Sequence, residues 1–208
     1  TIPEFNWKGK YILSEKEMRK YWITMRVEEN TTLRKKYKND PEGLRRAERQ
    51  LENDVGKKFW PNNEICIRHA EALRSDHPVL AKLWYFWGNH FTISDTQTLS
   101  SFSTGAYQRE FLRANMDKTF ETMVTEATLA WPMIMHLDNK DNVGPKSISG
   151  KEEWRRREKE PATINENHAR ELMELHTISP DGGYTQEDVI ELAKIMTGWR
   201  PKWTKRKD

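Results

Sequence analysis

The sequence predicts an all-α protein, a multi-helix single domain built as an irregular bundle. Two patterns predict this class: helix-start signals recur along the chain, and apolar residues repeat at steps of three and four without strand-like alternation. Size is the third observation, because 208 residues with nine Trp, seven Phe and six Tyr supply a core without disulfides. We therefore expect one helical domain over residues 1–208, with an exposed connection at about residues 139–163.

Helix starts follow one another in order. Ser14 and Glu17 form a capping box, and Asp40 stands before a proline at a first helical position. Asn63 and Thr185 can cap two further helices. We expect the remaining helices at residues 104–114, 118–130, 132–137 and about 165–177.

The most apolar helix begins at His77-Pro78 and ends near His90. Its apolar residues repeat at three and four residue steps and share one face: Leu80, Leu83, Trp84, Trp87 and Phe91. This face predicts a helix that packs into the core along one side.

Two stretches do not read as helices. Residues 138–163 hold several glycines and prolines around the charged run 151–160, which predicts an exposed connection, and residues 146–160 are expected to be sensitive to proteases. Residues 179–184 contain Pro-Asp-Gly-Gly, a strong turn pattern.

Composition excludes several classes of protein. The 35 basic and 32 acidic residues leave a net charge of +3 without a concentrated basic face, so nucleic-acid binding is not expected. No run approaches the roughly 18 apolar residues of a membrane span. Cys66 is the single cysteine, so the fold does not depend on an internal disulfide. We interpret Cys66 as a packed residue and His69, one turn later, as an exposed one.

The segment from Asn165 is the richest in polar residues. Glu166, Arg170 and Glu174 stand four apart, which is the spacing of a surface salt-bridge ladder. Glu171 lies on an adjoining face with Glu174, and carboxylates are common general acids and bases. Leu172 and Leu175 are expected to face the core. Both interpretations, a salt-bridge stripe and a site, stay open.

His90 lies on the apolar face of its helix, three residues after Trp87. A lone histidine in this position is often a hydrogen-bonded core residue. The neighbouring Gly88 permits close backbone approach, and Asn89 offers a donor and an acceptor, so a site is an equal alternative.

Several strings stand out together: LWYFWGNHF at 83–91, LDN at 137–139 with NVGP at 142–145, NENHARELMELHT at 165–177, DGGYTQEDV at 181–189, and residues 192–199. In order and spacing they resemble the bacterial family catalogued as domain of unknown function eighteen hundred. The resemblance extends from about Ile65 to Trp199.

The resemblance implies a bacterial protein, exported or periplasmic in many family members, with a cytoplasmic location not excluded. It also implies that this chain is the front part of a larger domain. No reaction, ligand or cofactor is implied. The sequence departs from the family pattern at Ser179, where the resemblance leads us to expect glycine, and at Pro180.

We therefore predict a polar site between the helix that ends at His90 and the helix that starts at Asn165. The first hypothesis is a hydrolytic enzyme of unknown substrate, and the alternative is a non-catalytic binding or scaffold protein in which the same residues form a structural network. The metal, the cofactor, and the small-molecule or protein partner stay open. The predicted catalytic residues are His90, Glu171, Glu174 and His176, and the predicted substrate-binding residues are Asn89, Asn139, Asn165, Asn167 and Arg170.

Overall fold

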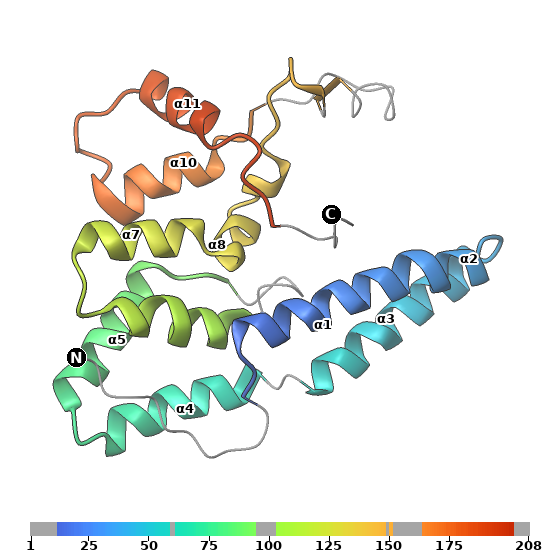
Figure 1. Ribbon diagram of the computed structural model, residues 1–208, viewed down its shortest axis with the longest axis horizontal. Coiled ribbons are helices and arrows are strands. Elements are labelled where there is room, and N and C mark those ends of the chain that lie inside the picture. Colours follow the sequence, from blue (N-terminus) through green and yellow to red (C-terminus); the bar gives the residue numbers. More distant parts are fainter. Residues whose placement is uncertain (1–11, 59–60, 95–102, 149, 152–163, 202–208) are drawn as a thin grey trace, which may run out of the picture.

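The computed structural model describes residues 12–58, 61–94, 103–148, 150–151 and 164–201. All regular secondary structure in these ranges is helical, which confirms the predicted all-α class (Figure 1). Within the same ranges, no helix is both long enough and apolar enough to cross a lipid bilayer.

The N-terminal part contains two long helices, α1 (Glu15–Glu28) and α3 (Pro41–Lys58), joined through η1 (Glu29–Leu33) and α2 (Arg34–Lys36). The predicted capping box starts α1, because the Ser14 amide donates to the Glu17 carboxylate at 2.9 Å and the Glu17 amide donates to Ser14 Oγ at 3.3 Å. Asp40 Oδ1 accepts from the Gly43 amide at 2.8 Å at the start of α3. Both predicted helix starts are confirmed.

Helices α4 (Pro61–Arg74) and α5 (Pro78–His90) follow as a pair. The chain then passes through η2 (Tyr107–Leu112) and η3 (Arg113–Asn115) to α7 (Phe120–Leu129) and α8 (Trp131–His136). The main core lies between α5 and these elements. Its buried residues are Phe91, Ile93, Tyr107, Leu112, Met123, Ala127, Ala130, Met133 and Leu137.

The C-terminal part consists of α10 (Asn167–Glu171), the π-helical η5 (Leu172–Thr177) and α11 (Gln186–Ile195). Figure 1 shows these elements above α7, at the opposite end of the molecule from α4. Their own core contains Ala169, Met173, Val189, Ala193 and Met196. Thr185 and Asp188 form the predicted capping box of α11.

The turn predicted at residues 179–184 is confirmed, and it explains the expected glycine. Ser179 has φ 73°, in the left-handed region where a side chain is strained and glycine is not. Gly183 also has a positive φ, of 82°. The Ile178 and Ser179 amides both donate to the Met173 carbonyl, at 2.8 and 3.1 Å, and close the preceding helix.

Three expectations about exposure are wrong. The first residues of the predicted exposed connection are buried, with Asn139 and Asn142 each 1% exposed, because they bind the end of α11. Cys66 is exposed and not packed. Leu175 was expected to face the core but is 57% exposed, because the helix changes its winding at Leu172. Residues 152–163 of the connection lie outside the described ranges.

Candidate functional site

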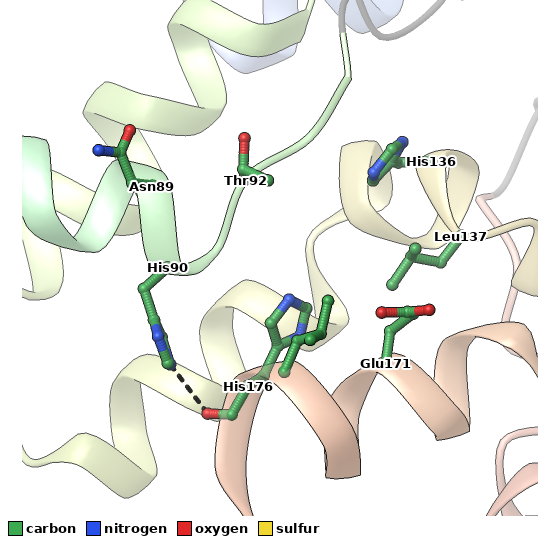
Figure 2. Close-up of a pocket in the computed structure, with 8 residues that line it drawn as sticks. Asn89, His90, Thr92, His136, Leu137, Glu171 and His176 are labelled. Carbon is green, nitrogen blue, oxygen red and sulfur yellow. Dashed lines mark hydrogen bonds between the residues drawn. The ribbon is translucent and has the colours of Figure 1, made fainter. Parts of the chain in front are cut away.

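A pocket of about 320 Å³ opens between the end of α5, the end of α8 and the α10–η5 helix. We call it the histidine–glutamate pocket, because three of its lining residues are histidines and one is a glutamate (Figure 2). Its volume is at the lower end of the range for small-molecule sites, roughly 300–1,000 Å³. The pocket is lined by Asn89, His90, Thr92, His136, Leu137, Glu171, Leu175 and His176.

The π-helical winding of η5 places Glu171 and His176 at the same pocket. Residues five apart diverge on an α-helix, where positions three and four apart are neighbours. A π-helix bonds each residue to the fifth one along and so brings such residues towards one face, and this rare winding recurs at functional sites. η5 begins directly after Glu171. In the view of Figure 2, the His176 ring lies between His90 and Glu171.

His90 is held in one orientation and one tautomer. Its Nε2 lies 2.9 Å from the backbone carbonyl oxygen of His176. A carbonyl oxygen only accepts, so Nε2 carries the proton, and in the neutral ring Nδ1 is the basic nitrogen. The ring also packs edge-on against Phe91, with centroids 4.6 Å apart, and edge-on against Trp87 at 5.6 Å. Both interpretations of His90 therefore describe part of what is found: the ring packs against core residues, and it also lines the pocket.

His136 comes from the last turn of α8. Its Nδ1 accepts from the Ser94 amide at 3.4 Å, so the neutral ring carries its proton on Nε2. Burial lowers the pKa of His136, and the nearby Asp138 carboxylate opposes that shift in part.

His176 and His168 form the buried side of the site. His176 is 5% exposed and His168 is fully buried. Burial, and then the neighbouring histidines, lower the pKa of each to about 4. Both rings are therefore neutral near pH 7. Neither ring nitrogen of His168 has a hydrogen-bond partner among the described residues.

Sequence reasoning did not select His136, His168 or Thr92. The available signal was position: His168 lies inside the string at 165–177, and His136 directly precedes the string at 137–145. A histidine count along the chain would also have helped, because four of the six histidines are in or beside this pocket: His90, His136, His168 and His176.

The predicted substrate-binding residue Asn139 is instead bonded to the protein backbone. Its amide donates to the carbonyls of Met196 and Trp199 at 3.1 and 2.9 Å. Asn142 donates to the Ala193 carbonyl at 2.8 Å and to Asn139 Oδ1 at 3.1 Å. These bonds engage the Ala193 carbonyl in the last turn of α11 and the Met196 and Trp199 carbonyls just beyond it.

Asn165 and Asn167 extend this arrangement. The Asn165 amide donates to the Asp138 carbonyl at 3.3 Å, and its backbone N–H donates to Asn142 Oδ1 at 3.1 Å. The Asn167 amide donates to the Leu137 carbonyl at 3.3 Å. We call these residues the asparagine network: Asn139, Asn142, Asn165 and Asn167.

Two further predicted residues lie outside the pocket lining. Arg170 forms an ion pair with Glu166 at 2.8 Å and donates to the Gln186 side chain at 2.7 Å, so it ties α10 to α11. Glu174 is half-buried but does not line the pocket. Of the predicted site residues, the structure therefore brings together Asn89, His90, Glu171 and His176.

Within the described part of the chain, no group of three or more His, Cys, Asp and Glu side chains has the arrangement of a metal site.

Fold and site together define an all-helical protein with a histidine–glutamate pocket between two helix ends. The chain belongs to the family described as Protein of unknown function (DUF1800), whose model matches residues 13–208. The match includes the resemblance expected over Ile65 to Trp199 and extends it toward both ends. No curated protein and no solved structure matches the chain.

Proposed function

We propose that the protein is a hydrolytic enzyme whose reaction takes place in the histidine–glutamate pocket, with Glu171 as its general base. The observation that supports this best is the convergence of one carboxylate and three histidines from three separate chain segments. Titratable groups gathered in a cleft are typical of functional sites, and burial lowers the pKa of two of these groups, His136 and His176.

Hydrogen bonding within the pocket supports a chemical role for Glu171. The bond from His90 to the His176 carbonyl is the only one drawn between the pocket residues of Figure 2. The Glu171 carboxylate is therefore not engaged by another pocket residue. It extends from α10 toward the end of α8, where His136 and Leu137 lie (Figure 2). A carboxylate in this state is available to a bound water or substrate.

The proposed step uses each group in the state that the geometry gives it. Glu171 accepts a proton from water while the water oxygen bonds to the electrophilic centre of the substrate. His176, neutral because of its lowered pKa, donates an N–H to the oxygen that gains negative charge. When the bond to the leaving group breaks, the protonated Glu171 returns its proton to that group.

A panel of chromogenic carboxylic esters, phosphate esters, glycosides and amides tests this function. The wild type is expected to turn over one class, and Glu171→Gln is expected to lower kcat by about 100-fold or more, the scale of general acid–base catalysis. Glu174→Gln is the matched control, since it makes the same change three residues away at a position outside the pocket lining. Circular dichroism and thermal unfolding of all three proteins verify that folding is unchanged.

Equal losses in the two variants, or no turnover of any class, would contradict this proposal. The second candidate is a non-catalytic binding protein, which the asparagine network favours because it shows polar residues of the same segment in structural use. In that case Glu171→Gln changes ligand affinity only.

A further inference from the structure

Three large apolar side chains stand exposed beside the histidine–glutamate pocket. Phe86 is 57% exposed, Phe120 is 46% exposed and Leu175 is 57% exposed. They come from three elements, namely α5, α7 and η5. We call them the apolar rim.

Ring contacts connect the apolar rim to the pocket. The Phe86 ring stacks parallel to His90, with centroids 6.1 Å apart and an interplanar angle of 8°. The Phe120 ring centroid lies 6.3 Å from that of His90. Leu175 itself lines the pocket. The apolar surface is therefore continuous with the polar site, and it is not a separate face of the molecule.

The volume of the pocket limits which part of a substrate it can hold and which part has to lie on the apolar rim. The pocket of about 320 Å³ holds a small polar group and a water molecule. A longer apolar chain attached to that group has to leave the pocket, and the rim is the apolar surface it meets at His90. Contact between such a chain and the rim removes apolar area of both from water, so a long apolar chain is expected to bind more tightly than a short one.

Resting on the proposed hydrolytic function, we propose that the substrate is a carboxylic ester with an apolar acyl chain, because the proposed step adds water to a centre whose oxygen gains negative charge beside the His176 N–H, as an ester carbonyl does. Its carbonyl lies in the histidine–glutamate pocket, and its acyl chain lies over Phe86, Phe120 and Leu175.

The test compares hydrolysis of 4-nitrophenyl acetate and 4-nitrophenyl hexanoate. Four added methylenes that are partly buried on the rim are expected to raise kcat/KM about tenfold in the wild type. In Phe86→Ser and Leu175→Ser, the preference is expected to fall to about threefold or less, because each variant removes apolar contact. Val79→Ser is the matched control, since Val79 is 69% exposed but lies in the first turn of α5, away from His90.

Acetamide and hexanamide provide a readout that does not depend on catalysis. Their affinities are measured from the shifts of the histidine ring protons in NMR spectra. Hexanamide is expected to bind about tenfold more tightly than acetamide in the wild type and in Val79→Ser, and much less selectively in the two rim variants.

The outcomes separate the two proposals. Hydrolysis of both esters without a chain-length preference, or a preference that survives both rim variants, overturns the rim and leaves the hydrolytic function standing. Absence of ester hydrolysis together with selective hexanamide binding supports the rim and contradicts Glu171 as the base for esters. Absence of ester hydrolysis with equal amide binding overturns the ester and the rim, whereas the hydrolytic function is overturned only if the panel of other substrate classes also shows no turnover.

Discussion

The asparagine network and the histidine–glutamate pocket both place polar side chains beside α10, and they differ in hydrogen bonding. Asn139 and Asn142 each use both amide N–H donors on oxygens of the protein. In the pocket, Glu171 bonds to no other residue drawn in Figure 2, and the buried His168 beside it has no partner among the described residues. A satisfied group contributes to stability, whereas an unsatisfied one costs free energy and is kept for another purpose.

Acidification is expected to change the stability of the protein most, and it acts through the histidines in and beside the pocket. His168 and His176 have a pKa of about 4 in the folded protein, against about 6.5 in the unfolded chain. Above pH 6.5 both states are neutral and the stability is complete. Between pH 6.5 and 4 only the unfolded chain binds protons, so each histidine removes up to about 3 kcal/mol from the free energy of unfolding.

Urea unfolding at several pH values measures this loss. His168→Leu is expected to reduce the loss of stability between pH 6.5 and 4 by up to about 3 kcal/mol, since one histidine with a lowered pKa is removed while His136 and His176 remain. His77→Gln, which replaces an exposed histidine, is the control and is expected to leave the pH dependence of stability unchanged. A pH dependence that persists in full in His168→Leu would show that other groups cause it.

Substitutions in the asparagine network are expected to cause the next largest loss of stability. Asn139→Leu removes the amide bonds to the Trp199 and Met196 carbonyls, of which the Met196 carbonyl keeps only the Trp199 backbone amide at 3.3 Å. This loss is expected to lower the free energy of unfolding by about 3 kcal/mol. Asn167→Ala is the smaller comparison, because this exposed residue donates one long bond of 3.3 Å, and we expect a loss of about 0.5 kcal/mol. Similar losses in the two variants would argue against a network centred on Asn139.

The turn between η5 and α11 provides a smaller effect. Ser179→Gly is expected to stabilise the protein by about 1 kcal/mol, because glycine adopts the left-handed conformation at φ 73° without strain. Gly183→Ala, at φ 82°, is expected to destabilise it by about the same amount. Thermal unfolding measures both, and a lower melting temperature for Ser179→Gly would contradict the strain that we assign to this position.

Much of the fold could be predicted from the sequence because its signals are local. Ser14 with Glu17 and Thr185 with Asp188 cap helices through bonds between near neighbours, and the structure contains both. Pro78 and His90 likewise bound α5 as expected. The turn at residues 179–184 follows from its one proline and two glycines.

The site was only partly predictable, because its arrangement depends on contacts between distant segments and on one local irregularity. The π-helical winding from Leu172 has no sequence signature that we used, and it moves Leu175 from the expected core to the pocket edge. The partners of Asn139 lie 57 and 60 residues away, so a polar residue there looked equally suited to a substrate. His136 was overlooked because only the fold brings α8 to α10.

The most direct test of the difference between pocket and network is the stability of Glu171→Gln measured beside Asn139→Leu. If Glu171 is kept for a ligand, its replacement leaves the free energy of unfolding within about 0.5 kcal/mol of the wild type, or raises it, while Asn139→Leu loses about 3 kcal/mol. Urea unfolding at pH 7 gives both values under the same conditions. A loss in Glu171→Gln as large as that in Asn139→Leu would contradict the account, because the carboxylate would then be part of the structural framework.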